Sequence, residues 1–151
     1  MKGLLDRLSI IIASVFFIGY IPIASGTFGS LAALIFMWVL KPDRPLLGVL
    51  VAAVFCLGTA AAHVVEGIFG KDSGRIVIDE FAGFMISVFS LPYTPGYLIA
   101  GFFLFRFFDI LKPPPIRNIE KAVKGGLGVM LDDVAAGLAT NLLLQVWRLV
   151  A

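Results

Sequence analysis

Charged residues and cysteine are both scarce in this sequence. Only 15% of the 151 residues are charged, the formal net charge is +2, and Cys56 is the single cysteine. A lone cysteine excludes a disulfide framework and a cysteine-rich metal site. The small net charge, without a basic run interleaved with stacking aromatic residues, argues against nucleic acid as a partner.

Long uncharged stretches dominate what remains. Apolar residues make up 60% of the chain, whereas a soluble domain of this size has about 45–50%. Residues 8–40 and residues 81–105 contain no charged side chain, so each stretch is long enough to span or nearly span a bilayer core. We therefore expect residues 1–151 to form one integral membrane domain. Residues 1–7 precede an apolar run as in a signal peptide, and we expect them to be retained.

Proline and glycine divide the chain into apolar helical segments. The predicted fold class is all-α: a polytopic membrane helix bundle of about five to six apolar segments, some of them short or broken. The expected segments are 8–21, 27–40, 46–63, 76–91, 97–111 and 127–147. Segments 8–21 and 97–111 are shorter than the roughly 20 residues that a full span needs. Whether residues 8–21 span the membrane is therefore left open.

Half of the acidic residues lie in or beside these apolar segments. Of ten acidic residues, five are Asp79, Glu80, Asp109, Asp132 and Asp133. Charges at membrane depth are costly and mark functional sites. If every segment from residue 27 onward crosses the bilayer, the segment ends that carry these carboxylates share one membrane face. We predict that the carboxylates form a single site.

Basic residues indicate which face this is. The same count of crossings puts six of them on the face of the site and three on the other. The first group is Lys71, Arg75, Lys112, Arg117, Lys121 and Lys124, and the second is Lys41, Arg44 and Arg148. Because positive residues concentrate in cytoplasmic loops, we expect the site to face the cytoplasm.

Carboxylate clusters of this kind suit a hard cation. Mg²⁺ commonly takes a few protein carboxylates and keeps water and phosphate oxygens as its other ligands. Mg²⁺ is therefore the predicted cofactor, with candidate ligands Asp79, Glu80, Asp109, Asp132 and Asp133. The sequence does not indicate which of them bind metal, or how many ions are bound.

Arg106, Asp109 and Lys112 recur every three residues along one side of a predicted helix end. Such a ladder can hold an anion. Alternatively, Arg106 and Asp109 only neutralise each other while Lys112 extends to the lipid headgroups.

Small polar residues open the segment that starts at residue 27. Gly26, Thr27, Gly29 and Ser30 would present free backbone N–H groups and hydroxyls to a phosphate at a helix N-terminus. The same residues would equally serve as a helix cap or a tight helix crossing. His63 is the single histidine, and it is either structural or a proton donor or phosphate ligand.

Two stripes of polar and small residues are spaced for one helix face each. Asp133, Gly137 and Asn141 follow at steps of four, and Gly83 and Ser87 continue the face of Asp79 in the same way. We expect the first stripe to face the bundle interior, since small residues let helices pack tightly.

Four motifs in order resemble the phosphatidylglycerophosphatase A family. They are residues 26–30 (GTFGS), 78–83 (IDEFAG), 105–113 (FRFFDILKP) and 125–137 (GGLGVMLDDVAAG). Their order and spacing are similar to the family's over roughly residues 20–140. One departure is Ile78, where the family often has an aromatic residue.

The resemblance implies a multi-pass lipid phosphatase of the bacterial inner membrane. Its substrate would be the phospholipid phosphatidylglycerophosphate, converted with Mg²⁺ to phosphatidylglycerol and phosphate. The family's motif residues correspond here to Asp79, Glu80, Arg106, Asp109, Lys112, Asp132 and Asp133. Of these, all but Lys112 are predicted to be catalytic, whereas Arg106 and Lys112 are grouped with Gly26, Thr27, Gly29, Ser30 and His63 as candidate substrate-binding residues.

Several alternatives stay open at this level. The nucleophile is either a metal-oriented water or a carboxylate. No Cys-x5-Arg loop or Asp-x-Asp motif is present, and one histidine argues against a two-histidine phosphatase. A small ion-coupled transporter is the main alternative function, and a noncatalytic membrane module with self-neutralising charges is a third. Oligomeric state and activity on other lipid phosphates are not indicated.

Overall fold

The computed structural model describes residues 2–71 and 73–150; residues 1, 72 and 151 of the predicted domain lie outside these ranges. The described residues form helices and no strand. The elements are α1 (Lys2–Ala13), the 3₁₀ helix η1 (Ile18–Tyr20), α2 (Ser25–Leu40), α3 (Arg44–Phe69), α4 (Ile78–Ser87), α5 (Pro95–Leu111), α6 (Ile116–Ala122) and α7 (Gly125–Val150). The all-α prediction is confirmed.

Several predicted boundaries were wrong. The first helix ends at Ala13 and not at residue 21, because Val15, Phe16 and Phe17 take positive φ angles of 47°, 53° and 70°, which no right-handed helix allows. Helix α3 continues six residues past His63, to Phe69. Helix α4 ends at Ser87 and not at residue 91, and the short α6 was not predicted.

Two helices, α3 and α7, are long and apolar enough to cross a membrane. Each has 26 residues, or about 39 Å at a rise of 1.5 Å per residue, against a hydrocarbon core about 30 Å thick. Helix α2 is apolar but shorter, with 16 residues. Length and composition therefore support two spans directly, and α2, α4 and α5 are shorter than a typical span.

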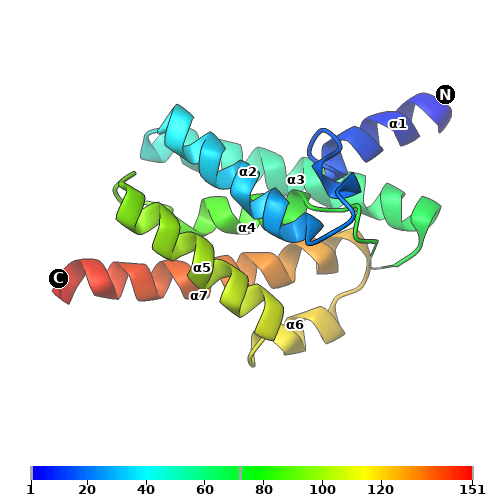
Figure 1. The fold of residues 1–151 in the computed structure, drawn as a ribbon. Helices are drawn as coiled ribbons and strands as arrows, with labels where there is room; N and C mark the ends of the chain where they lie inside the picture. Colours follow the sequence, from blue (N-terminus) through cyan, green and yellow to red (C-terminus); the bar gives the residue numbers. More distant parts are fainter. Residues whose placement is uncertain (1, 72, 151) are drawn as a thin grey trace.

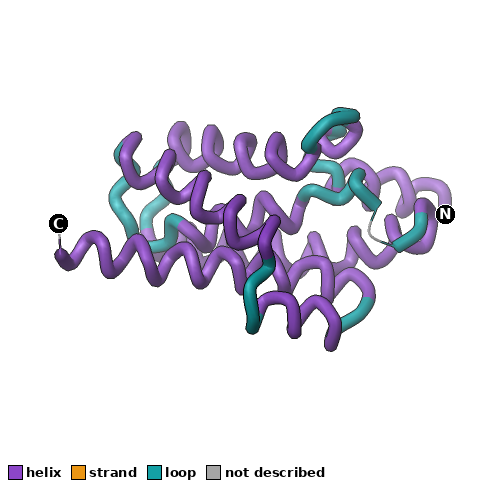
Figure 2. Tube along the Cα trace, turned by 60° about the horizontal axis from the view of Figure 1, so that its bottom comes forward, coloured by secondary structure: helices purple, strands orange, loops and turns teal. Residues whose placement is uncertain are grey.

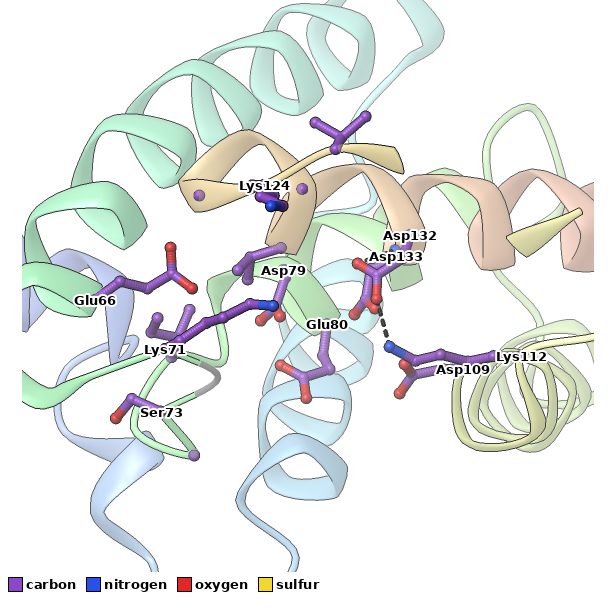
Figure 3. A pocket seen from close by; sticks show the side chains of 16 residues that line it. Glu66, Lys71, Ser73, Asp79, Glu80, Asp109, Lys112, Lys124, Asp132 and Asp133 are labelled. Atoms are coloured by element: carbon purple, nitrogen blue, oxygen red, sulfur yellow. Dashed lines mark hydrogen bonds and ion pairs between the residues drawn. The ribbon is translucent and has the colours of Figure 1, made fainter. Parts of the chain in front are cut away.

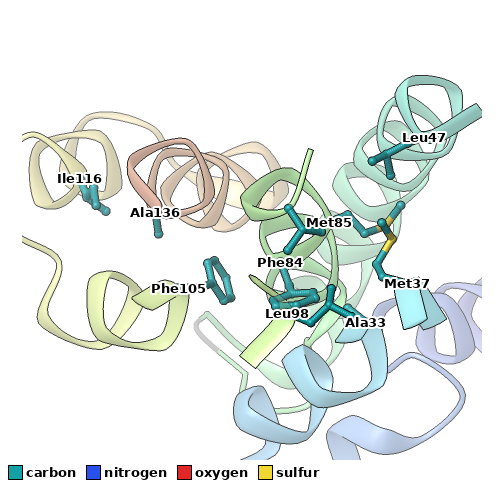
Figure 4. Packing of buried hydrophobic residues seen from close by; sticks show 10 residues of the cluster. Ala33, Met37, Leu47, Phe84, Met85, Leu98, Phe105, Ile116 and Ala136 are labelled. Atoms are coloured by element: carbon teal, nitrogen blue, oxygen red, sulfur yellow. The ribbon is translucent and has the colours of Figure 1, made fainter. Parts of the chain in front are cut away.

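Helix α4 lies at the centre of the bundle. It packs against α2, α3, α5 and α7, which run along the long axis of the molecule in Figures 1 and 2. Its Phe84 and Met85 are fully buried and form the core with Met37 of α2 and with Leu98 and Phe105 of α5 (Figure 4). Packing of these buried side chains explains how a helix of only ten residues is stable in this position.

Glycines bring α4 and α7 into backbone contact. A Cβ atom at Gly137 would overlap the carbonyl oxygen of Gly83, and one at Gly83 would lie 2.8 Å from the carbonyl oxygen of Asp133. Asp79 and Asp133 each precede one of these glycines by four residues, which is about one helical turn. The crossing therefore places the two carboxylates side by side, and the predicted stripes face the interior.

The C-terminal end of α4 is held by side chains of α7. Asn141 donates hydrogen bonds from Nδ2 to the carbonyl oxygens of Ser87 (3.1 Å) and Phe89 (2.9 Å). Gln145 donates to the Phe89 carbonyl at 3.2 Å, and Arg148 to that of Ser90 at 3.0 Å. Ser87 is the last residue of α4, and Phe89 and Ser90 lie in the turn that follows it. Helix α7 therefore supplies donors to the last carbonyl of α4, which has no partner within the helix, and to the turn.

Replacing Asn141 with leucine is expected to lower the free energy of unfolding by about 1–2 kcal/mol, since the Ser87 carbonyl loses the donor from α7 and the Phe89 carbonyl keeps only Gln145. Thermal unfolding in detergent measures the effect. Leu142→Ala is the matched control, because the neighbouring Leu142 side chain is 66% exposed and should shift stability by less than about 0.5 kcal/mol. Equal melting temperatures for Asn141→Leu and the wild type would contradict this account of the cap.

Candidate active site

Three carboxylates converge where α4 and α7 begin to cross. One oxygen each from Asp79, Glu80 and Asp133 lies within 4.8 Å of the others. Asp79 and Glu80 occupy the first turn of α4, where the helix dipole favours negative charge. Asp133 is 3% exposed, and it comes from α7. Three carboxylates this close repel one another unless a cation or protons intervene.

Each of the three carries an oxygen without a hydrogen-bond partner. The orphaned atoms are Asp79 Oδ1, Glu80 Oε2 and Asp133 Oδ2, all of them buried. Buried polar atoms normally have a partner, and an unsatisfied carboxylate oxygen is particularly costly. The orphaned oxygens form an all-oxygen donor set that could hold a hard cation.

Helix α5 adds two cations to the same site. Arg106 forms an ion pair with Asp109, and its Nη1 atom lies 3.8 Å from Glu80 Oε1. Lys112 pairs with Asp132, which is 6% exposed. The neutralising Arg106–Asp109 pair therefore exists, but Arg106 also reaches Glu80, so it is part of the cluster.

The carboxylates and Lys112 line one wall of a cavity of about 270 Å³ (Figure 3), whereas Arg106 lies behind Glu80 and Asp109 and is not among the lining residues. Asp79, Glu80, Asp109, Asp132, Asp133 and Lys112 were expected from the sequence, and all six line it. Glu66, Lys71, Ser73 and Lys124 also line the cavity, although sequence reasoning did not select them for the site. The sequence does contain a pattern that could have indicated two of them. Ser73-Gly74 and Lys124-Gly125 each place a polar residue beside a glycine, shortly before a helix that carries a pair of acidic residues.

Of the small residues at the start of α2, one borders the site and others take part in helix packing. A Cβ atom at Gly26 would overlap Glu80 Oε1 and lie 3.2 Å from Arg106 Nη1, so Gly26 borders the site. Gly29 lies against Val77, and the buried Ser30 hydroxyl donates to the Gly26 carbonyl at 3.0 Å. Thr27, Gly29 and Ser30 are not among the cavity-lining residues, and their binding of substrate stays a prediction.

His63 is exposed on α3, outside the cavity lining. Its Nδ1 atom would lie 3.4 Å from a Cβ atom placed at Gly125. Its backbone nitrogen would lie 2.6 Å from a Cβ atom placed at Gly126. His63 therefore packs beside the turn that starts α7, and its role in substrate binding also stays a prediction.

Comparison with known proteins identifies relatives along most of the chain. A protein of Bacteroides thetaiotaomicron, proposed to be a phosphatidylinositol-3-phosphatase, is 40% identical over 151 residues, which cover 93% of this chain and 94% of that protein. Phosphatidylglycerophosphatase A of Escherichia coli is 41% identical over 124 residues (80% and 72% covered), and that of Haemophilus influenzae is 39% identical over 141 residues (87% and 85%). No solved structure is significantly similar.

The sequence profile of phosphatidylglycerophosphatase A matches residues 11–148. This range includes every carboxylate of the site together with Arg106 and Lys112. Profile and relatives agree on the family that the four motifs indicated. The chain therefore belongs to the phosphatidylglycerophosphatase A family, a family of phosphatases.

Proposed function

We propose that the protein is a Mg²⁺-dependent phosphatase that hydrolyses the terminal phosphomonoester of phosphatidylglycerophosphate, giving phosphatidylglycerol and phosphate at the cytoplasmic membrane face. The observation that carries this proposal is the triad of Asp79, Glu80 and Asp133, with its buried, orphaned oxygens near Arg106 and Lys112. Family membership supplies the reaction class.

The triad fits Mg²⁺ by its chemistry. Asp79, Glu80 and Asp133 offer only oxygen ligands. Asp109 and Asp132 line the same cavity and could act as further ligands or accept hydrogen bonds from water bound to the ion. When bound, Mg²⁺ would offset the charge of the phosphate and acidify a coordinated water.

The cations of α5 provide the groups that hold the phosphate. Arg106 can offer two N–H groups in a fork to phosphate oxygens, and Lys112 adds a second positive charge. Asp109 and Asp132 keep these cations in position through their ion pairs. In the reaction an oxygen nucleophile attacks phosphorus and the bond from phosphorus to the glycerol oxygen breaks. If water attacks, it gives one proton to the leaving glycerol oxygen; if a carboxylate attacks, water must then hydrolyse the acyl phosphate to release phosphate. Arg106 and Lys112 would stabilise the charge that develops on the phosphoryl oxygens.

The names of the relatives narrow the substrate class. Phosphatidylglycerophosphate and phosphatidylinositol 3-phosphate both carry a phosphomonoester on a headgroup that is joined to the lipid by a phosphodiester. The family profile and two of the three relatives favour the first of these. We therefore propose phosphatidylglycerophosphate as the substrate.

The outer surface supports a multi-pass membrane bundle. Apolar side chains such as Ile35, Val49 and Phe103 are 53%, 66% and 67% exposed, which suits lipid better than water. Aromatic residues collect at the end away from the site, where Tyr97 stacks with Trp147 and Lys41 lies over Trp38, as at a membrane interface. Together with the bias of basic residues described above, this distribution supports our proposal that the site lies at the cytoplasmic face of a bacterial inner membrane.

A transporter would need access to the carboxylates from both membrane faces. The cavity at the site is lined by helix ends and by the loops that precede α4 and α7. Farther along the bundle, the fully buried Phe84, Met85 and Met37 fill the space beside α4. This arrangement favours the enzyme over the transporter.

Purified protein in detergent is expected to release phosphate from short-chain phosphatidylglycerophosphate when Mg²⁺ is present. Chelation should remove the activity, and readdition of Mg²⁺ should restore it, because the phosphate cannot approach six carboxylates lining the cavity without compensating charge. Circular dichroism before and after chelation checks that the fold persists. Undiminished phosphate release after chelation would overturn the metal dependence.

A further inference from the structure

Cations occur on two opposite sides of the carboxylates. Arg106 and Lys112 come from α5, whereas Lys71 and Lys124 come from the loops before α4 and α7 and line the same cavity. In Figure 3 the Lys71 side chain extends toward Asp79 and Glu80 from the side opposite Lys112. Lys71 and Lys124 could therefore meet a second anionic group of a ligand whose phosphate is held at the triad and by α5.

We propose that Lys71 and Lys124 bind the phosphodiester of the lipid headgroup, so that the protein selects lipids with a phosphodiester and a terminal phosphomonoester. This inference rests on the proposed function and assigns the substrate recognition of the same site. The sequence and the relatives' names leave both lysines without a role.

The size of the cavity supports a ligand larger than one phosphate. Its volume of about 270 Å³ approaches the lower end of the roughly 300–1,000 Å³ found for small-molecule sites. A headgroup with two phosphates joined by glycerol can then meet the triad with one phosphate and the lysines with the other. Beside Lys71, the exposed side chains of Ile68, Phe69 and Tyr20 provide an apolar surface for the acyl side of the lipid.

The charged residues that line the cavity also support binding of the phosphodiester by the lysines. Among the described residues that line the cavity, six are carboxylates and three are lysines. A substrate with two phosphates adds further negative charge, so each lysine that faces it reduces the cost of binding. Lysine is well suited to this task as a compact charge on a flexible stem.

Residues 74–77, which follow Lys71 and lead into α4, are fixed against the N-terminal part of the chain. Ser25 Oγ donates to the Gly74 carbonyl at 2.7 Å, and the Val77 N–H donates to the Ala13 carbonyl at 2.9 Å. The Arg75 guanidinium lies 4.1 Å from the ring centroid of Phe69 and 5.2 Å from that of Tyr20. These contacts hold this edge of the cavity in place before substrate binds, which lowers the entropic cost of recognition.

The turn that carries Lys124 is fixed against α3. Gly125 has a positive φ of 73°, and Gly126 packs directly on the backbone of Thr59 and His63. A side chain at Gly126 would overlap the Thr59 carbonyl. The close contact explains the glycines and holds Lys124 at the cavity.

The test separates the two phosphates of the substrate. Short-chain phosphatidylglycerol keeps only the phosphodiester, and inorganic phosphate represents the monoester. For Lys71→Ala and Lys124→Ala, the inhibition constant of phosphatidylglycerol should rise on the order of tenfold each, while that of inorganic phosphate changes less than about twofold. The KM for phosphatidylglycerophosphate should rise more than kcat falls, and Lys→Arg variants should recover most of the loss.

Lys121→Ala is the matched control, since Lys121 is exposed on the neighbouring α6 but does not line the cavity. An equal rise in both inhibition constants, or no rise in either, would overturn the proposal. Stabilisation of the protein by short-chain phosphatidylglycerol, measured as a shift in melting temperature, provides a readout independent of catalysis. If the wild type binds this lipid through the lysines but does not hydrolyse phosphatidylglycerophosphate, the proposed function fails and the lipid site stands.

Discussion

Asp79→Asn is expected to reduce kcat/KM for phosphate release by at least about 10²–10³-fold, the range found when one charge-stabilising group is removed from an active site. The replacement keeps the shape of the side chain but removes one anionic ligand from the triad. It also relieves repulsion among buried carboxylates, so the melting temperature without Mg²⁺ should not fall. Stabilisation by added Mg²⁺, which follows from binding to the folded state, should weaken.

Asp43→Asn provides the matched control for this prediction. Asp43 caps α3 at the end of the bundle away from the site, where its Oδ1 accepts from the Leu46 N–H at 2.9 Å. Asparagine caps helices as well as aspartate does, so activity and Mg²⁺ response should be those of the wild type. An Asp79→Asn protein with a tenth or more of wild-type activity would remove Asp79 from the catalytic machinery.

Gly137→Ala is expected to lower the free energy of unfolding by about 2–3 kcal/mol, because the added methyl group overlaps the Gly83 carbonyl and lies 3.2 Å from Ile86 Cβ. Helices α4 and α7 would have to separate. Asp79 and Asp133 lie one turn from this crossing, so activity should fall together with stability. Thermal unfolding and phosphate release, measured on the same preparation, test both parts.

The same glycine-to-alanine substitution at Gly48 should not lower the free energy of unfolding. A Cβ atom at Gly48 meets nothing within 4 Å, and alanine in a helix interior is more favourable than glycine by roughly 0.5–1 kcal/mol where the methyl group fits. Gly48→Ala is therefore expected to be neutral or stabilising. Comparable destabilisation by the two substitutions would mean that the Gly83–Gly137 contact is not what limits the approach of the helices.

The helix spacing in the sequence predicted the centre of this molecule well. The steps of four in Asp133-Gly137-Asn141 place an acid, a close contact and a hydrogen-bonding amide on one face, and the structure uses all three against α4. Counting apolar segments also predicted that Asp79, Asp109 and Asp133 lie together, and all three line one cavity, whereas His63 does not. Periodicity and chain direction were sufficient because these residues lie on regular helices, including the ten-residue α4.

Positions set by tertiary contacts could not be predicted in this way. The first helix stops at Ala13 because the buried Ser14 hydroxyl accepts from the Phe17 N–H at 3.0 Å within a run of left-handed residues, and none of these is glycine. Lys71 and Lys124 reach the cavity from loops whose course depends on Ser25, Tyr20 and Thr59. Loops of this kind have no repeating pattern for the sequence to reveal.

The cap that α7 places on α4 bears on how the chain is assembled during synthesis. The donors for the carbonyls of Ser87, Phe89 and Ser90 come from residues 141–148 and lie 52 to 58 residues farther along the sequence. These carbonyls lack the donors until α7 has been made and has packed against α4. Asp133 of the triad also lies on α7, so the same helix completes both the capped end of α4 and the carboxylate cluster.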